Sequence, residues 1–378
     1  MRSTHVPVRE YHYQSMSDYL ARLYAREDLQ DYLYTDPTTH QYRRPDGVWD
    51  IWEAPVLRDF LGPDGRTPFI KPPDKEGRLV FSLNMDGFNP YGTKQSGKKV
   101  TVGAIYMVCL NLPPAIRYDI ENMYLVGVIP GPQAPSLHQI NYYLKPLVDE
   151  LLALWTTGVY LSRTRRCLTG LLVRCAMIPL VCDLPAARQM SGFAPHRAHQ
   201  FCSVCTLSWD RIHDLNFKEW VPRDHTSHRI AAESWRDAAT LAEREGCYRQ
   251  NGLRWSELLR LPYWDPSRYT VIDSMHAFYL RLFQHHCRKV WGMDITVEDG
   301  DGITFDISAN HPTEDEMKRA QETLRSGSKT VLKQLRSAVV QELCRSLELG
   351  LHGAKPVLVE RLLQYVSGLD CILDQIVY

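Results

Sequence analysis

The chain has 378 residues, of which 44% are hydrophobic and 23% are charged, so it can bury a substantial core and form two or three modules. Its 44 Lys and Arg residues balance its 44 Asp and Glu residues. The formal net charge of zero excludes a global basic excess, so any nucleic-acid binding must come from local patches.

The sequence predicts neither a membrane span nor a secretory signal. No stretch approaches the roughly 18 consecutive apolar residues of a membrane span. The N-terminal stretch MRSTHVPVREYHYQ lacks the apolar core of a signal peptide. Ten cysteines without such a signal predict a reducing compartment. We therefore expect no membrane partner.

Residues 1–75 are interpreted as a peripheral helical arm and linker. Apolar residues recur at roughly helical spacing within 17–34, which predicts one or two short amphipathic helices. A stretch rich in Pro, Gly and Lys follows at 62–76. No chemistry is expected here, and the arm is predicted to serve packing.

The next stretch, RLVFSLNMDGFNP at 78–90, predicts a buried strand that ends on an acid. The apolar run reaches Met85, and the turn residues Gly87 and Pro90 break it just after Asp86. A carboxylate at the end of a buried strand is held rigidly and faces open space, as a metal ligand or catalytic acid must be. The alternative is an Asp that simply opens a turn.

The order of elements extends this prediction. Strands are expected near 79–85, 100–110, 123–129 and 173–181, with an amphipathic helix between the third and fourth. The fourth strand also ends on an acid, Asp183, and a helix start follows it.

Strand, strand, strand, helix, strand, helix is the order of a ribonuclease H-like fold, a mixed α/β fold in which the first and fourth strands are neighbours. Asp86 and Asp183 would then meet and could share divalent metals, with Mg²⁺ or Mn²⁺ as the expected cofactor. Two such ions stabilise both the attacking and the leaving oxygen of a phosphodiester.

Several short motifs resemble the CACTA (En/Spm-type) transposase family, and fungal members in particular. The resemblance covers roughly residues 17–292. The matching segments are MDGFNP (85–90), NLPP (111–114), IPGP (129–132), YLKPLVDELLALW (143–155), CDLPAARQMSGF (182–193), CSVC (202–205) and VIDSMHAFYL (271–280). The resemblance implies a DDE/D transposase with a ribonuclease H-like core at 76–200 that cuts and joins double-stranded DNA with Mg²⁺. Asp86 and Asp183 fall on the first two catalytic acids.

A mostly helical insertion is expected at 201–260. Cys202-x-x-Cys205 puts two thiols on one tight turn, and His225-x-x-His228 puts two imidazoles on one helical face. Together they predict a tetrahedral structural zinc site, although the histidines are one residue closer than the usual spacing. A buried cysteine pair with surface histidines is the alternative. A redox pair is a further one, but the expected βαβ context is lacking.

Residues 261–330 contain Asp273-x-x-His276 on a predicted helix, followed by an acidic loop with a short strand. The family resemblance implies that this segment lies near the active site. Asp273 would then bind metal and His276 would contact a phosphate. A helix N-cap Asp with a structural His is the equally open alternative.

The segment 331–367 predicts a helix, a turn at Gly353 and a second helix, before a tail at 368–378. It resembles the SAP motif, a helical hairpin that binds DNA. Lys355, Arg361 and Arg336 would meet phosphates in a salt-sensitive, sequence-independent contact. A plain helical hairpin is the alternative.

A third catalytic acid is not evident beyond Asp273, so the sequence is interpreted as a transposase that is truncated and whose activity is in doubt. Three functions stay open: a metal-dependent DNA-processing enzyme, a DNA- or chromatin-binding module without nuclease activity, and an inert gene fragment. We expect a nuclear location, double-stranded DNA as partner and no small-molecule substrate. A homo-oligomer is left open.

Overall fold

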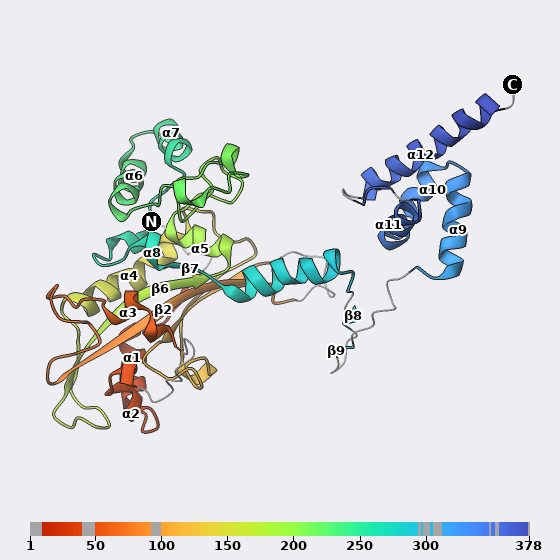
Figure 1. Cartoon of the computed structure of the whole chain (residues 1–378). Helices are drawn as coiled ribbons and strands as arrows, with labels where there is room; N and C mark the ends of the chain where they lie inside the picture. Colours follow the sequence, from red (N-terminus) through yellow and green to blue (C-terminus); the bar gives the residue numbers. More distant parts are fainter. Residues whose placement is uncertain are drawn as a thin grey trace, which may run out of the picture. The chain divides into compact units, whose positions relative to one another are not determined.

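The computed structural model of the chain describes residues 10–39, 50–91, 100–293, 296–297, 303–304, 312–347, 349–351 and 355–376, with side chains to 366 in the last range (Figure 1). The contacts between residues divide the chain into two compact units, Met1–Ala277 and Phe278–Tyr378. Each unit is a separate body and is described by itself.

The first unit is mixed α/β, as predicted. Its strands are β1 (His12–Tyr13), β2 (Glu76–Phe88), β3 (Val102–Cys109), β4 (Met123–Ile129), β5 (Val159–Leu161), β6 (Leu171–Cys182) and β7 (Thr270–Ile272). Its α-helices are α1 (Met16–Ala25), α2 (Gln30–Leu33), α3 (Pro55–Arg58), α4 (Ile140–Thr156), α5 (Leu184–Ser191), α6 (His225–Asp237), α7 (Leu241–Asn251) and α8 (Pro266–Tyr269). Short 3₁₀ turns are η1 (Pro37–Thr39), η2 (Ile51–Glu53), η3 (Ile120–Asn122), η4 (Trp209–Arg211), η5 (Phe217–Glu219) and η6 (Glu257–Arg260).

One sheet organises this unit, in the order β1-β4-β3-β2-β6-β5, with β7 beside β6. β2, β3 and β4 form the antiparallel meander that the sequence predicts. β6 then pairs with β2 in parallel, and β7 pairs with β6 in parallel. The predicted order of elements is confirmed, while β5 and β7 were not predicted because each is only three residues long.

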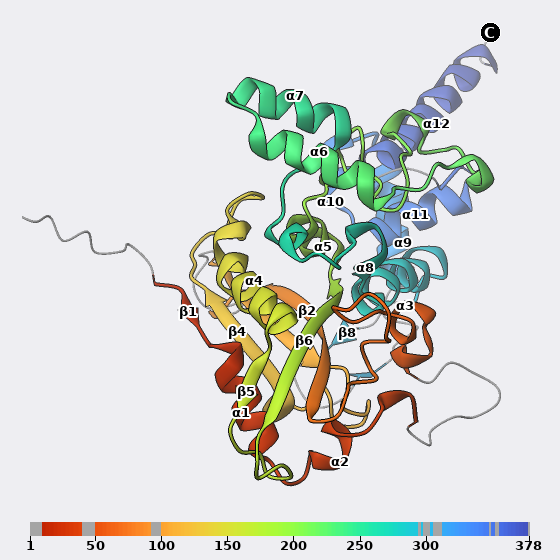
Figure 2. The same cartoon turned by 90° about the vertical axis from the view of Figure 1, so that its left-hand side faces the viewer.

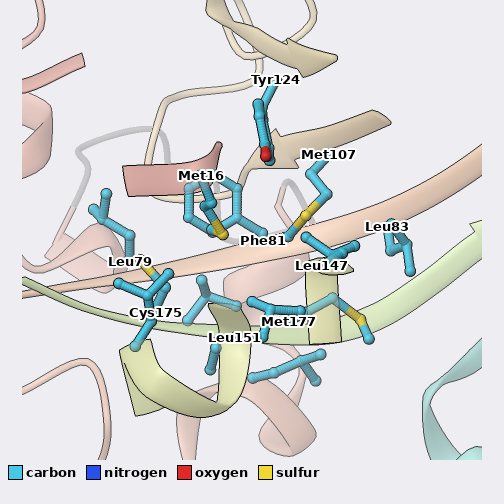
Figure 3. Packing of buried hydrophobic residues seen from close by; sticks show 14 of the residues in the cluster. Met16, Leu79, Phe81, Leu83, Met107, Tyr124, Leu147, Leu151, Cys175 and Met177 are labelled. Atoms are coloured by element: carbon cyan, nitrogen blue, oxygen red, sulfur yellow. The ribbon is translucent and has the colours of Figure 1, made fainter. Parts of the chain in front are cut away.

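The main core lies on one face of the sheet. Side chains alternate along a strand, so Leu79, Phe81 and Leu83 of β2 all point to this face. They pack against Met107 of β3 and Met177 of β6 (Figure 3). Helix α4 lies along the strands here (Figure 2), and its Leu147 and Leu151 close the core.

The N-terminal arm serves packing, as predicted, but its helix α1 is not peripheral. Met16, Leu20 and Tyr24 of α1 are fully buried and belong to the main core. The spacing of apolar residues in the arm predicts an amphipathic helix but does not say which surface that helix covers. The structure shows that its apolar side packs on the core of the sheet.

The opposite face of β2 becomes progressively open toward the C-terminal end of the strand. Val80 is 0% exposed and Ser82 is 8% exposed. Asn84 is half-buried and Asp86 is exposed. The predicted strand-end acid therefore stands where the sheet emerges from the core.

A left-handed glycine joins α5 to the insertion. Gly192 ends α5 with a φ of 82°, and its carbonyl oxygen accepts a 2.8 Å hydrogen bond from the Arg254 amide. A Cβ on Gly192 would collide with the Arg254 carbonyl oxygen. Only a residue without a side chain fits this position.

We therefore expect Gly192→Ala to destabilise the first unit. The left-handed backbone alone costs about 1–2 kcal/mol for a residue with a Cβ, and the collision adds to this. Urea unfolding of the full chain measures the change in free energy. Gly246→Ala, inside α7 with no atom within 4 Å of the added Cβ, is the matched control. Equal stability of the two variants would contradict the prediction.

The second unit holds a small helical core. Its elements are α9 (Glu314–Arg325), α10 (Lys329–Gln334), α11 (Ser337–Ser346), α12 (Lys355–Ile376) and the strand pair β8 (Thr296–Val297) and β9 (Ile303–Thr304). The π-helical segments η7 (Met275–Phe283) and η8 (His286–Val290) precede them. Within the described residues, the expected hairpin of α11 and α12 packs with α9 and α10 around Leu343 and Leu362. Gly353 lies outside the described residues.

Candidate functional site

Two predicted acids lie at the same level of the sheet. Leu83 of β2 pairs with Leu180 of β6, and the strands run in parallel. Asp86 and Asp183 each follow three residues later, so the pairing brings them side by side near the C-terminal ends of the two strands. Neighbouring strands are about 4.8 Å apart. The sheet thus brings together the two carboxylates that the sequence pattern singled out.

A third acid joins them through β7. Cys182 of β6 pairs with Ile272 of β7, and the next residues along the two strands are Asp183 and Asp273. The Asp273 amide donates a 3.1 Å hydrogen bond to the Cys182 carbonyl oxygen, which extends the pairing by one residue. Asp183 and Asp273 directly follow β6 and β7, whereas Asp86 lies inside β2, which continues to Phe88 and so does not end at Met85 as predicted. The three acids are therefore near the C-terminal ends of three adjacent parallel strands.

The electrostatics around Cys182 show that the three charges are close together. Its buried thiol accepts a 3.2 Å hydrogen bond from the Met85 amide. Burial is the largest factor that raises the pKa of Cys182 to about 12, and the charges of Asp183, Asp86 and Asp273 raise it further. The Cys182 thiol thus interacts electrostatically with all three carboxylates.

Each carboxylate also makes a local contact. Asp86 accepts a 2.7 Å hydrogen bond from the Gly87 amide, and Asp183 caps α5 by accepting a 2.8 Å bond from the Ala186 amide. Asp273 accepts from the Met275 amide at 3.0 Å and pairs with Nδ1 of His276. Burial acts to raise the pKa of Asp273, but these bonds outweigh it and hold the pKa below its usual value.

Each carboxylate is thus engaged in a local contact of its own. Across the described part of the chain, no three His, Cys, Asp or Glu side chains converge closely enough to hold a metal ion. The donor chemistry nevertheless fits Mg²⁺ or Mn²⁺, because three carboxylates on adjacent strand ends offer the oxygen ligands that hard cations prefer. Side-chain rotation at a fixed backbone would be needed to bring these oxygens to one ion.

The predicted zinc ligands lie in the insertion. The sulfur atoms of Cys202 and Cys205 are 3.4 Å apart, and both thiols are free. His228 of α6 is 2% exposed, and neither of its ring nitrogens has a hydrogen-bond partner. His225 points toward Asp265, with its Nδ1 3.8 Å from the carboxylate oxygen. The surface-histidine alternative therefore does not describe His228.

A half-buried arginine, Arg223, interacts with this cluster. Burial lowers the pKa of Arg223, and the two thiols Cys202 and Cys205 oppose that shift. Burial, Arg223 and His225 lower the pKa of His228 to about 3. His228 is therefore neutral at physiological pH, which is the form of imidazole that binds metals.

The predicted DNA-binding residues of the second unit differ in the contacts that their side chains make. Arg336 forms an ion pair with Glu316 of α9 at 2.6 Å. Arg361 donates to the Gly350 carbonyl oxygen. Lys355 is half-buried at the first position of α12.

Comparison with known proteins identifies one part of the chain. Residues 70–241 match a transposase family, described as Transposase family tnp2. The tnp2 match runs from the linker before β2 to the start of α7, and it includes Asp86, Asp183, the cysteine pair and the histidine pair. Asp273 and the second unit lie outside it. No curated protein matches the chain.

The tnp2 match supports a transposase-derived function, and with it DNA as a partner. The described helices were also compared with the length and hydrophobicity of a membrane span. None of them is both long and apolar enough to cross a bilayer.

Proposed function

We propose that this chain is a transposase-derived protein whose first unit cuts and joins DNA phosphodiesters with Mg²⁺ or Mn²⁺. The observation that supports the proposal is that Asp86, Asp183 and Asp273 lie near the C-terminal ends of three adjacent parallel strands. A ribonuclease H-like core is supported by the order β4-β3-β2-β6-β7, with β3 alone antiparallel to both neighbours. CACTA membership, a fungal origin and a nuclear location are part of the same proposal and rest on the motifs.

The roles of the residues follow from their positions. Asp86, Asp183 and Asp273 would hold the divalent metal, which stabilises the attacking and leaving oxygens of the phosphodiester. His276 holds the Asp273 carboxylate through Nδ1, so its other ring nitrogen is left to contact a phosphate oxygen. Because Asp273 supplies a third carboxylate, the site does not depend on an acid elsewhere in the chain.

Nicking of supercoiled DNA by the full chain tests this proposal. Nicking should require Mg²⁺ or Mn²⁺ and should be lost in Asp86→Asn. DNA binding that survives Asp86→Asn without any nicking by the wild type would instead support a DNA- or chromatin-binding module. If the protein shows neither nicking nor DNA binding, the remaining interpretation is an inert gene fragment.

A structural zinc ion on Cys202, Cys205, His225 and His228 is a separate proposal. The close sulfur pair and the buried, unpartnered imidazole of His228 support it. His225 Nδ1 is 3.8 Å from the Asp265 carboxylate oxygen, too far for a hydrogen bond, and this nitrogen has no hydrogen-bond partner that zinc would have to displace. The zinc would crosslink the segment before α6 to α6 itself.

We propose that the second unit makes a DNA contact of its own, because residues 331–367 resemble a SAP hairpin. We expect Lys355→Gln to weaken duplex binding uniformly across sequences and to reduce the salt slope by about one phosphate contact. Arg336→Gln should act less, because Glu316 already neutralises Arg336. Fluorescence anisotropy over a salt series measures both variants. A larger effect of Arg336→Gln than of Lys355→Gln would reverse this assignment.

A further inference from the structure

An open hollow lies on the sheet beside the three acids. It has a volume of about 400 Å³ and is lined by Ser82, Asn84, Tyr106, Val108, Tyr118, Ile120, Met123, Leu125 and Val181. These residues come from β2, β3, β4, β6 and the segment before β4. The hollow is therefore formed on the sheet face opposite to the main core.

The strand register connects this hollow to the carboxylates. Asn84 pairs with Tyr106 of β3, and Asp86 pairs with Ala104 two residues farther along. Alternate residues of a strand share a face, so Asn84 and Asp86 stand on the same side of β2. The hollow thus begins one side-chain position away from the first acid.

Tyr106 confirms this closeness from the other strand. Burial is the main cause that raises the pKa of its hydroxyl, and the charges of Asp86, Cys182 and Asp273 raise it further. The Tyr106 ring therefore lines the hollow while its surroundings include two of the three acids.

The lining has the chemistry of a nucleobase site. Tyr106 and Tyr118 offer aromatic faces, and Asn84 offers an amide that can both donate and accept hydrogen bonds. No charged side chain lines the hollow, which argues against a phosphate as its occupant. Tyr118 is 62% exposed and Leu125 is 47% exposed, so a ligand from solvent can reach the apolar surface.

We propose that this hollow binds one unstacked nucleobase of the DNA strand whose backbone lies at the three carboxylates. Pairing edges of a base would meet Asn84, and its flat face would stack on Tyr106 or Tyr118. Holding a base next to the scissile bond would fix the register of the strand, because the base and its phosphate are covalently joined. This inference rests on the proposed function, since it takes DNA as the substrate.

The test compares two probes at one fixed salt concentration without added Mg²⁺. The first is a DNA duplex with a single unpaired adenine, and the second has an abasic residue at that position. The wild-type full chain should prefer the unpaired adenine by about tenfold, within the range that stacking on an aromatic side chain supplies. Tyr106→Ala and Tyr118→Ala should each reduce that preference, and Tyr106→Phe should retain it.

Tyr142→Ala is the matched control, because Tyr142 lies on α4 at 73% exposure and does not line the hollow. Circular dichroism and thermal melting establish that each variant is folded, and the exposed Tyr118 provides a variant that leaves the core intact. No preference in the wild type, or the same preference in both alanine variants, overturns the proposal. A changed oligomeric state in Tyr118→Ala without any base preference also overturns it and assigns the hollow to a protein partner.

Nicking is measured on the same preparations, so that the two proposals can fail separately. A base preference that depends on Tyr106 and Tyr118, in a protein that never nicks DNA, supports the base site and rejects the proposed cleavage. Mg²⁺-dependent nicking without any base preference supports cleavage and rejects the base site.

Discussion

Asp86→Asn is expected to abolish Mg²⁺-dependent nicking of DNA. The substitution keeps the shape of the side chain but removes the charge at the end of β2, where the proposed metal binds. Loss of one carboxylate ligand costs the reaction several kcal/mol of charge stabilisation, which is a rate decrease on the order of 10² or more. Gel analysis of supercoiled plasmid measures the rate, with Asp59→Asn as a surface control. Asp59 is paired only with its neighbour Arg58 at the surface, so its variant should nick at the wild-type rate.

The same assay on Asp183→Asn and Asp273→Asn decides how many acids form the site. The strand pairing places Asp273 next to Asp183, so equal losses in all three variants are expected. Mg²⁺ or Mn²⁺ affinity, measured by calorimetry, should fall in parallel. Loss in Asp86→Asn and Asp183→Asn, with wild-type behaviour of Asp273→Asn, would instead indicate a two-acid remnant.

The second large effect is expected on removal of zinc from the insertion. Metal analysis of the purified full chain should find about one zinc per chain, as four ligands require. Arg188 is buried and Arg223 is half-buried, and the charge of Cys202 acts to raise the pKa of both guanidinium groups. A metal-bound thiolate pair would balance their charge, because a buried charge is costly unless it is paired.

Chelation or the double substitution Cys202→Ser/Cys205→Ser should therefore remove the zinc and destabilise the first unit. A loss of ~3 kcal/mol would lower the melting temperature by about 5–10 °C for a unit of this size. Differential scanning calorimetry with and without EDTA measures the shift. Cys247→Ser changes a half-buried cysteine of α7 outside the proposed site, and it should keep both the zinc and the melting temperature. A zinc-free wild type, or zinc retained in the double variant, would contradict the assignment.

Local sequence signals were sufficient for the meander and for two of the acids. The apolar run before Asp86 and the one before Asp183 are long, and turn or helix-start residues follow each of them directly. β2 and β6 are the observed elements, and their bounds are only a few residues wider than predicted. Such signals are local because a buried strand must be apolar along its own length.

Local signals failed where a segment gains its structure from its partners. β7 has three residues, too few to show a pattern, and it is a strand because it pairs with β6. The burial of Tyr24 in the main core likewise depends on the packing of α1, since its spacing alone is that of any amphipathic helix.

The sequence by itself predicted the mixed α/β class, the order of the central elements, and the positions of Asp86 and Asp183 near the C-terminal ends of β2 and β6. For Asp273 the sequence left a metal ligand and a helix N-cap open, and only the tertiary structure showed that it stands beside Asp183 and that Tyr106 lines a hollow next to the same edge. The physical reason is that strand pairing joins residues far apart in the chain, and one step of register moves every side chain to the other face. Pairing at that range leaves no local pattern around Tyr106, and for Asp273 only the resemblance of 271–280 to a transposase motif gave a signal.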